Sequence, residues 1–538
     1  RVIGVPTEMV PPCAEVSDRR AAGIVIVRLK REHPFIKGSE RTVRKMPDHF
    51  AVPAFDPLEQ DVGTGAVNTE AGNQGPPWTF SPVSQPVLCC GWRNETALAA
   101  DPVVTHRLQI AQRRQDLLLK VYRRHFTFAG KYFPKLVGAE DLTKEVLDDW
   151  YSYFHQCSQC RRCSVFCPYG IDTAEITIIG RELLNLLGLN IDWIATPVSN
   201  CYQTGNHLGI QPHAFKDMLD FFVEDIEEIT GVNCEPNYNK KGADILFITP
   251  SGDVFADPGT YTCMGYLILF QFLKDKYGLD VTWSTYASEG GNFGFFTSHE
   301  TMKRLNAKMY AEAKRLGVKW ILGGECGHMW RVINQYMDTM NGPADFLEEP
   351  VSPITGTKFE NAKSTKMVHI TEFVADLIKH GKLDLDPSRN DHLKVTYHDS
   401  CNPSRGMGLL EEPRYVIKNV CNNFYEMPAN TIREQTFCCG SGSGLNAGEN
   451  MELRMQGGLP RANAVQYVHD QHGVNMLSCV CAIDRAAFPA LMEYWVPEVG
   501  VCGIHELVGN ALVVEGEKER KVDLRGDPLA GMEEEPDA

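Results

Sequence analysis

The sequence lacks any long hydrophobic run. Its longest strongly apolar stretch, Gly265 to Leu273, is interrupted by Gln271 and is far shorter than the ~20 residues that a membrane-spanning helix needs. Hydrophobic residues make up 43% and charged residues 23% of the 538 positions, the balance of a soluble globular protein. These values exclude a multi-span membrane protein and argue against wholesale disorder, and the length suggests three or four domains.

Positive charge is also scarce. Lysine and arginine total 53 against 69 aspartates and glutamates, so the formal net charge is −16. This balance removes the electrostatic basis for nonspecific binding to DNA or RNA, and we expect no nucleic-acid partner. For the same reason, any attachment to a membrane is expected to use a specific protein surface rather than attraction to anionic lipid.

Cysteine, in contrast, is abundant, with 18 residues. Arg19-Arg20 followed by AAGIVIV has the outline of an export signal, but Arg28, Lys30 and Arg31 end the apolar run after seven residues. The sequence therefore favours a cytoplasmic location, where thiols stay reduced. Clustered cysteines in such a chain are interpreted first as metal ligands.

Four segments differ in pattern. Residues 1–100 hold many Pro and Gly residues and predict a loop-rich or partly disordered segment. Residues 101–239 repeat apolar residues at helical spacing, and residues 240–512 alternate short apolar strands with helix-length segments, which predicts parallel α/β units. Residues 513–538 contain nine acidic against four basic residues and predict an acidic, solvated tail.

The α/β region contains a weak internal repeat. ILFITPSGD aligns with KVTYHDSCN, and ASEGGNFG aligns with TFCCGSGSG. A third match, of GVKWILGGECG with GVNMLSCVCAI, brings Cys326 near the position of Cys481. We interpret residues 240–390 and 391–512 as two related halves, of which the second keeps a full set of thiols.

The strongest motif is Cys157-x2-Cys160-x2-Cys163-x3-Cys167-Pro168, which lies between predicted helices. Three thiolates at this spacing can bind one face of a cubane [4Fe-4S] cluster. In two-cluster ferredoxins the last cysteine binds the other cluster, and no second run is present here. Cys167 is therefore either the fourth ligand of a lone cluster or a ligand to another centre.

A second group of thiols follows the predicted strands of the second half. Its members are Cys401, the pair Cys438-Cys439, and the pair Cys479 and Cys481. Each piece comes just past a strand, where α/β folds place ligand-binding loops. Five thiolates are one more than a cubane needs, and adjacent cysteines can reach two irons of an open cluster.

Three segments of this second group, HDSCNPSRGMGLLEEPRY, TFCCGSGSGLN and LSCVCAIDRAA, resemble the CCG-domain cluster site of heterodisulfide reductases. With HQCSQCRRCSVFCPYGIDTAEIT, NCYQTGNHLGIQPHAFKD and ILGGECGHMWRVINQYMDTMNGPADF the resemblance narrows to DsrK, the K-subunit family of the Dsr (DsrMKJOP) membrane complex. It covers about residues 100 to 512. It implies an α+β multidomain fold, in which a helical ferredoxin-like [4Fe-4S] domain precedes an α/β CCG domain like that of the B and D components of heterodisulfide reductase.

The resemblance also implies the ligand sets. A noncubane [4Fe-4S] cluster would be held by Cys401, Cys438, Cys439, Cys479 and Cys481, and part or all of a cubane by the thiols at 157, 160 and 163. Heterodisulfide reductases usually end the pattern in CxxC, so either thiol of the CVC pair could be a non-ligand.

A second cubane run, expected near residues 50–110, is absent from the sequence. That stretch offers only Cys89-Cys90-Gly91, which we interpret as a decoy. Either one cluster of the electron path has been lost or the N-terminal segment is atypical.

Four residues are candidate catalytic groups. His398 and Asp399 precede Cys401, and either could donate the proton that a leaving thiolate needs, as could His328. Cys326 is either an additional ligand or redox thiol, or a small buried residue after a strand.

The resemblance implies a cytoplasmic oxidoreductase subunit of sulfur metabolism, peripheral on the inner face of the cytoplasmic membrane through other Dsr subunits. Electrons from menaquinol would arrive through a membrane b-type cytochrome, and a DsrC-like carrier would supply the protein disulfide or trisulfide that is reduced or reversibly oxidised. The alternatives are a protein like the D component of heterodisulfide reductase acting on a small-molecule mixed disulfide, a pure electron-relay subunit, and a zinc-binding structural module.

Overall fold

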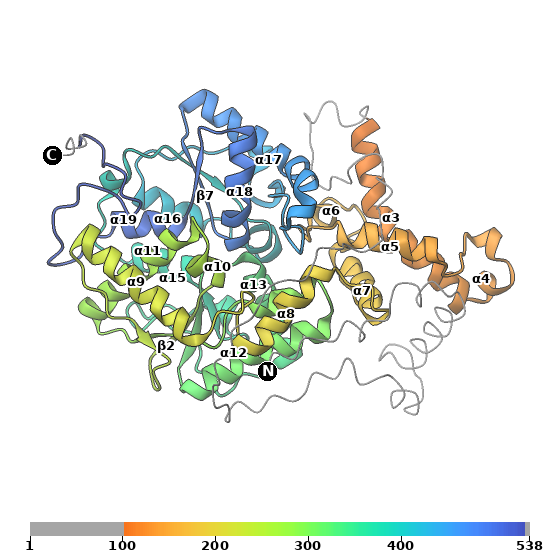
Figure 1. Ribbon diagram of the computed structural model, residues 1–538, viewed down its shortest axis with the longest axis horizontal. Helices are drawn as coiled ribbons and strands as arrows, with labels where there is room; N and C mark the ends of the chain where they lie inside the picture. The colour runs from red at the N-terminus through yellow and green to blue at the C-terminus, as the bar shows by residue number, and fades with distance from the viewer. Residues whose placement is uncertain (1–101, 533–538) are drawn as a thin grey trace, which may run out of the picture.

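The computed structural model describes residues 102–532 (Figure 1). The loop-rich segment predicted for residues 1–100, with Cys13 and the Cys89-Cys90 pair, lies outside the described residues. Within the described part of the chain, no helix combines the length and the apolar character needed to cross a bilayer. Helices and parallel sheets are both present, in agreement with the α+β prediction.

The first part of the described chain is helical. Its elements are α3 (Pro102–Phe126), α4 (Phe128–Tyr132), η5 (Pro134–Val137), α5 (Lys144–His155), α6 (Arg162–Val165), α7 (Thr173–Leu186), α8 (Asp192–Thr204) and α9 (Pro212–Thr230). The apolar faces of α3, α5 and α7 meet in a small core that includes Leu117, Trp150, Phe154 and Leu184. Thr143 caps α5 and Asp172 caps α7 by accepting backbone N–H groups, which fixes where each helix begins.

A five-stranded parallel sheet follows, with strand order β1-β3-β2-β4-β5. Its strands are β1 (Asn237–Tyr238), β2 (Ile245–Ile248), β3 (Val281–Trp283), β4 (Trp320–Gly323) and β5 (Met367–His369). The connecting elements are α10 (Ser251–Phe255), α11 (Gly259–Tyr277), η6 (Gly290–Phe295), α12 (His299–Leu316), α13 (Gly327–Val332), η7 (Ile333–Met337), α14 (Asp338–Asn341), η8 (Glu360–Ala362) and α15 (Ile370–Lys379).

A three-stranded parallel sheet completes the fold, in the order β6-β7-β8. Its strands are β6 (Val395–His398), β7 (Met476–Cys479) and β8 (Gly500–Gly503). The helices and short turns around it are η9 (Pro387–Asn390), η10 (Asn402–Gly406), α16 (Glu412–Val420), η11 (Ala429–Thr431), η12 (Arg433–Gln435), η13 (Gly448–Asn450), α17 (Met451–His472), α18 (Ala482–Trp495) and α19 (Ile504–Ala511).

The two sheets share one hydrophobic core. Strands β2 and β6 both contribute to it, with α11, α15, α16 and α19 between them. The longest apolar stretch of the sequence is the middle of α11, which is buried on all sides. Helices α11 and α19 cross closely because glycine stands at both contact points: a Cβ on Gly265 would lie 1.8 Å from the carbonyl oxygen of His505, and one on Gly509 2.7 Å from Cα of Gly265.

Two details differ from the sequence expectations. Helix α9, within the predicted helical region, packs through Phe215, Phe222 and Ile226 on the core of the α/β region, because its apolar face matches that surface. Residues 513–532 were expected to be solvated, but they pack on the body through buried Leu524.

Candidate functional site

The loop from Cys157 to Cys167 joins α5 to α7 and contains the short helix α6. Gln159 and Arg161, which flank Cys160, adopt left-handed backbone conformations with φ of 59° and 58°. Such residues turn successive N–H groups toward one concave side, an arrangement found at many iron-sulfur sites. The N–H of Gln159 donates to Sγ of Cys157 at 3.4 Å. The loop therefore has a local geometry suited to a sulfur-bound anion.

The inner thiols of this loop, Cys157 and Cys160, are buried, and the outer thiols at 163 and 167 are partly exposed. Burial raises the pKa of Cys157, but Arg114 and Arg181, with hydrogen bonds to the sulfur, outweigh burial and lower the pKa below its usual value. The thiolate is the form that binds metal. The inner end of the loop thus favours the ligand form.

The second group of thiols gathers at the carboxyl ends of β6 and β7. Cys401 begins the turn η10 after β6, and Cys481 is the N-cap of α18 two residues past β7. The Cys438-Cys439 pair lies in the loop that precedes α17. Backbone N–H groups point at these sulfurs: Gly440 donates to Cys438 and Gly327 to Cys481, both at 3.3 Å.

Cys479 and Cys481 have different neighbours. Sγ of Cys479 contacts the carbonyl oxygen of Cys502 at 3.7 Å, at the end of the adjacent strand. Sγ of Cys481 lies 3.9 Å from Nδ1 of His328 on α13. Cys481 therefore faces the loop after β4, whereas Cys479 lies among strand ends.

The two cysteine motifs meet. Cys160 of the helical part packs against Cys401 and Cys438. Sγ of Cys438 also contacts Oγ of Ser158 at 3.1 Å, and a Cβ on Gly442 would lie 2.7 Å from the carbonyl oxygen of Ser158. The GSGSG segment after the CC pair therefore lets the backbone of the Cys157–Cys167 loop approach closely. Thiols that are far apart in sequence form one contact region, which we call the cysteine seam: Cys160, Cys401 and Cys438.

Buried arginines hold this seam together. Arg162 is sandwiched between the rings of Phe166 and Phe437, at 4.8 and 4.7 Å, and donates to the carbonyl oxygen of Thr436 at 2.9 Å. Arg331 donates to the carbonyl oxygen of Gln159 at 3.0 Å.

Arg181 donates to the carbonyl oxygen of Cys157 at 2.6 Å and to Oγ of Ser443 at 2.5 Å. Each of these guanidinium groups lies across the contact between the helical and α/β parts. Their planar donor sets satisfy carbonyl oxygens that would otherwise be buried without partners.

The histidine and aspartate before Cys401 have different roles. Nε2 of His398 lies 3.4 Å from Oδ2 of Asp484, and the nearby side chains of Cys439 and Ser400 also favour the ionised carboxylate and help to lower the pKa of Asp484, against the opposing effect of burial. Asp399 accepts two bonds from Arg414, at 2.7 and 2.6 Å, and one from the backbone N–H of Arg433. These contacts engage both carboxylate oxygens of Asp399 and tie the start of the Cys401 loop to α16, and a catalytic role for Asp399 stays a prediction.

Cys326 caps α13 and accepts a bond from the N–H of Met329 at 3.4 Å. Burial raises its pKa well above the usual value, and the neighbouring Cys481 thiol adds to the effect. Burial lowers the pKa of His328 to about 4, so this imidazole is neutral near pH 7. Cys326 thus lies close to Cys481, as a neutral thiol.

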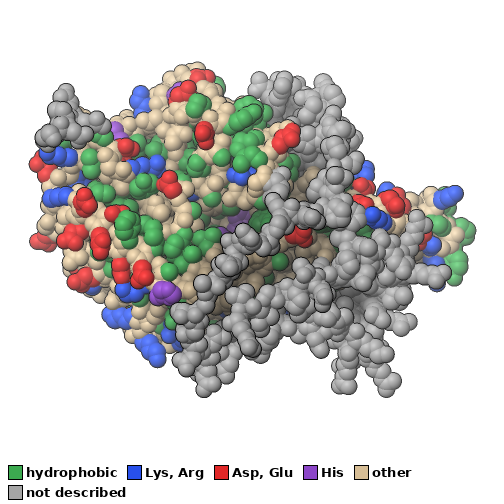
Figure 2. Space-filling view, in the orientation of Figure 1, with side chains coloured by type: hydrophobic (Ala, Val, Ile, Leu, Met, Phe, Trp, Pro, Cys, Tyr) green, Lys and Arg blue, Asp and Glu red, His purple; other side chains and the backbone are tan. Residues whose placement is uncertain are grey.

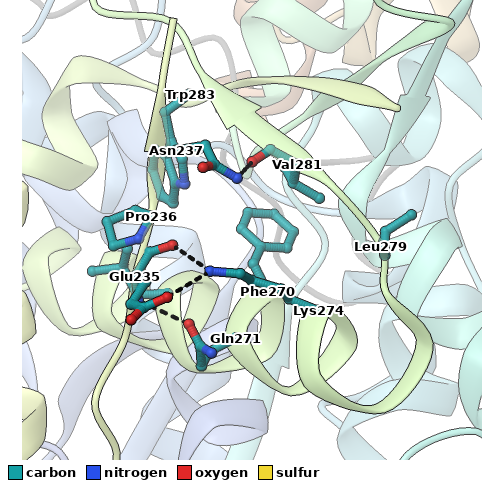
Figure 3. Close-up of a pocket in the computed structure, with 10 residues that line it drawn as sticks. Glu235, Pro236, Asn237, Phe270, Gln271, Lys274, Leu279, Val281 and Trp283 are labelled. Carbon is teal, nitrogen blue, oxygen red and sulfur yellow. Dashed lines mark hydrogen bonds and ion pairs between the residues drawn. The ribbon is translucent and has the colours of Figure 1, made fainter. Parts of the chain in front are cut away.

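A shallow pocket beside β3 is unrelated to this region (Figure 3). It is lined by Glu235, Asn237, Phe270, Lys274 and Trp283 among others, and no cysteine lines it. Its polar groups pair with one another, as Nζ of Lys274 lies 3.0 Å from Oε2 of Glu235. We assign it no ligand.

Comparison with known proteins shows which family the chain resembles. Residues 395–479 match the CCG family, described as a cysteine-rich domain, which leaves Cys481 two residues beyond the match. The chain is 50% identical over 433 residues to an Hdr-like menaquinol oxidoreductase iron-sulfur subunit of Archaeoglobus profundus, covering 77% of this chain and 78% of the relative. A second such subunit, from Archaeoglobus fulgidus, is 50% identical over 439 residues, covering 78% and 79%.

The chain belongs to the Hdr-like menaquinol oxidoreductase iron-sulfur subunits. The D component of the dihydromethanophenazine:CoB–CoM heterodisulfide reductase of Methanosarcina mazei is a more distant relative, with 42% identity over 84 residues, 15% of this chain and 20% of that one. The expected relationship to heterodisulfide reductases is confirmed at the level of the family. The narrower resemblance to DsrK stays a prediction.

The residues of this Hdr-like subunit fit iron-sulfur centres. Among the described residues no three His, Cys, Asp or Glu side chains converge as on one metal ion, whereas a four-iron cluster spreads its ligands over a larger body. Beside Cys401, Nδ2 of Asn402 and both Nε and Nη1 of Arg405 are buried without a hydrogen-bond partner. Unsatisfied donors next to buried thiols are what a sulfur-rich anionic cluster would satisfy.

Sequence reasoning missed several residues of the Hdr-like site. Asp484 stands three positions after Cys481 in the first turn of α18, and this spacing was the available signal. Arg162 lies inside the CRRC motif, and nothing in this local pattern distinguishes it from an ordinary loop residue. Arg485 pairs with both Asp253 and Glu325, tying α18 to the loop that carries Cys326. No local pattern indicates such long-range pairs.

Proposed function

We propose that this Hdr-like subunit is the catalytic iron-sulfur subunit of a membrane-bound, quinol-linked complex. The Cys157–Cys167 loop would hold a cubane and the CCG edge a noncubane cluster, and these groups would supply the electron transfer by which a protein disulfide or trisulfide is reduced or reversibly oxidised. The observation that supports this best is the cysteine seam, because it puts the two ligand sets in direct contact. The sulfur carrier is a DsrC-like protein.

The cysteines and arginines of this chain have separate roles. Cysteines 157, 160, 163 and 167 would hold the cubane, and cysteines 401, 438, 439, 479 and 481 the noncubane cluster. When bound, these clusters supply one-electron chemistry and, at the open cluster, a site for sulfur. The arginines across the seam keep the two ligand loops at a fixed separation, so the transfer path needs no domain movement.

Reduction of a disulfide consumes two electrons and two protons and releases two thiols. The His398–Asp484 pair is the proton-holding group nearest the CC pair, since Asp484 contacts Cys439. His328 lies beside Cys481, and because its imidazole is neutral near pH 7 it can accept a proton there rather than donate one. Both histidines are buried, so their imidazoles are shielded from bulk water.

Electrons enter at the outer end of the cluster loop. Cys163 and Cys167 are partly exposed there, and the side chains of Val165, Phe166 and Tyr169 are exposed around them. An apolar surface beside a cluster suits a docked electron donor. We assign the donor as a membrane b-type cytochrome fed by menaquinol, with this subunit on the inner, cytoplasmic face beside other Dsr subunits.

Two other functions use the same residues. A small-molecule mixed disulfide could be the substrate, as the name of the Methanosarcina relative suggests for that protein. A pure relay subunit would need cubanes only, and the five thiols at the CCG edge exceed that need.

Binding of a DsrC-like protein separates these possibilities. The full chain, purified without oxygen, is immobilised and exposed to a DsrC-like protein before and after alkylation of its C-terminal thiols. We expect capture of the unmodified protein and at least ~tenfold weaker capture after alkylation, or about 1.4 kcal/mol. Equal capture of both forms would contradict the protein-disulfide proposal, and turnover of a small mixed disulfide without the carrier would favour the heterodisulfide reductase alternative.

A further inference from the structure

A rigid projection at one end of the molecule is unexplained by the proposed reaction. It consists of residues 119–139, the end of α3 with α4 and η5, and we call it the finger. In Figure 1 it forms the far right end of the long axis, and the α5–α7 region lies between it and the α/β body. The finger is therefore the part of the described chain farthest from the CCG edge on that side.

Local hydrogen bonds fix the shape of the finger. Oγ1 of Thr127 donates to the carbonyl oxygen of Arg123 at 2.8 Å and accepts the N–H of Gly130 at 3.0 Å, which turns the chain back after α3. The N–H of Glu140 donates to the carbonyl oxygen of Lys120 at 3.3 Å and closes the base. The backbone of the tip therefore has a defined shape.

Large apolar side chains are held outward on this surface. Phe128 is 74% and Leu136 85% exposed, and Tyr122, Tyr132 and Phe133 are exposed as well. Burying an apolar side chain of this size stabilises a protein by roughly 1.5–3 kcal/mol. Five such side chains that stay exposed in the finger do not contribute this stabilisation to the fold. Contiguous apolar patches of this kind mark interaction surfaces.

The charge of the finger opposes that of the whole chain. Residues 119–139 contain no Asp or Glu, and they contain Lys120, Arg123, Arg124, Lys131 and Lys135, in a chain of net charge −16. Lys120 and Arg124 pair with carboxylates at the base. Among the described residues, Lys131 and Lys135 at the tip form no ion pair. Green apolar and blue basic side chains alternate at this end in Figure 2.

The composition of the finger indicates whether a lipid membrane or a protein partner binds it. Aromatic residues interleaved with Lys and Arg are typical of the membrane–water interface, where rings lie at the headgroup level and cations face anionic lipid. Protein–protein interfaces also favour aromatic residues but are depleted in lysine. The two lysines between the aromatic residues therefore favour lipid over a protein partner.

We propose that the finger inserts its apolar tip, Phe128, Tyr132, Phe133 and Leu136, into the headgroup region of an anionic membrane, with Lys131 and Lys135 facing lipid phosphates. This proposal rests on one part of the proposed function, the location of the subunit at a membrane. It does not depend on the proposed disulfide chemistry. It orients the subunit with the Cys157–Cys167 loop between the membrane and the CCG edge. From the net charge of the whole chain we expected the subunit to attach to the membrane only through protein surfaces. The basic finger is a local exception to that expectation.

Vesicle flotation of the full chain tests this. The wild type should float with phosphatidylcholine vesicles that contain phosphatidylglycerol and remain behind with phosphatidylcholine alone. The triple variant Phe128→Ser, Phe133→Ser and Leu136→Ser, and separately Lys131→Gln with Lys135→Gln, should bind anionic vesicles at least about tenfold more weakly, since each cation near such a surface and each buried ring contributes.

The matched control removes exposed aromatic residues elsewhere: Tyr467→Ser with Tyr494→Ser, on α17 and α18, should bind as the wild type does. All variants should retain iron content and dye-linked disulfide reduction, which shows that loss of flotation is independent of the proposed reaction. Insertion itself is detected with Phe133→Trp, whose emission should shift to the blue on anionic vesicles.

Two outcomes would overturn the proposal. One is equal flotation of the triple variant and the wild type. The other is absence of wild-type flotation with attachment only when the membrane subunits are present, which would make the finger a protein-docking surface.

Discussion

At the scale of single residues, the adjacent thiols of the CC pair have different neighbours. Cys438 points to Ser158 of the helical part and belongs to the cysteine seam. Cys439 packs in the core beneath the second sheet and contacts Asp484 on α18. Two adjacent thiolates cannot comfortably bind one iron but can reach two irons of an open cluster.

Replacing Cys439 with alanine tests this assignment. We expect Cys439→Ala to abolish the [4Fe-4S]3+-type EPR signal of the oxidised protein, because one iron loses its thiolate. The spectrum of the reduced cubane should persist, and disulfide reduction should fall to about one hundredth or less.

Cys421→Ala is the matched control, since this thiol is equally buried but lies in the core shared by the two sheets. It should leave both EPR spectra unchanged. An unchanged oxidised signal in Cys439→Ala would remove Cys439 from the ligand set.

At the scale of elements, the contact between α7 and α12 depends on one histidine. Nδ1 of His299 lies 2.8 Å from Oε2 of Glu182, and Nε2 lies 3.8 Å from Oε2 of Glu175. Hydrogen bonds to Glu175 and Glu182 raise the pKa of His299 to about 9, although partial burial opposes them. The protonated ring therefore joins the helical part to the α/β part.

This contact should weaken in alkaline solution. Because the folded-state pKa is above the ordinary value of 6.5, its stabilisation is complete below about pH 6.5 and is lost as pH rises through about 9. Solvent screening limits the contribution to about 1–2 kcal/mol. Thermal unfolding midpoints at pH 6.5 and 9.5 should differ more for the wild type than for His299→Gln, with His380→Gln as a surface control. Identical pH slopes in all three proteins would contradict the prediction.

Elements with continuous apolar runs could be predicted from the sequence. ADILFIT, VKWILGG and VNMLSC became β2, β4 and β7, because buried parallel strands leave an uninterrupted hydrophobic signal. Strands β5 and β8 span only three and four residues, and β8 begins and ends in glycine, so no periodic signal identifies them. Helix α8 leaves a weak signal, because Pro197 and polar residues interrupt its apolar pattern.

At the scale of the whole molecule, the end of the described chain closes the shared core. Leu524 is buried in it, and the side chain of Arg525 pairs with Glu506 on α19. The acidic composition predicted solvent exposure, but three hydrophobic residues, Val514, Leu524 and Leu529, are buried and decide the outcome.

Leu524→Ala should lower the free energy of unfolding by about 2–5 kcal/mol, because it leaves a cavity in the core. Glu519→Ala, an exposed neighbour, should change it by no more than about 0.5 kcal/mol. Urea unfolding followed by tryptophan fluorescence measures both. A loss below about 1 kcal/mol in Leu524→Ala would show that residues 513–532 are only loosely attached.

The candidate site was only partly predictable at this scale. The cysteine motifs carry a local signal, and their strand-end positions follow from the strand predictions. The seam between Cys160, Cys401 and Cys438 depends on docking of segments far apart in sequence, and so do Arg162 and Asp484. Pairings of this kind leave no periodicity that a sequence can reveal.

The seam also constrains how the protein matures. Cys160 and Cys438 come into contact only after the helical part has docked, and Arg162 then closes over the contact with less than a tenth of its surface exposed. On the proposed ligand assignment, iron has to reach these thiols before or during docking, since afterwards they are shielded from a delivery protein. Cluster loading would then be a step in the folding of this chain, and protein produced under iron limitation should accumulate with the two parts undocked and open to proteolysis.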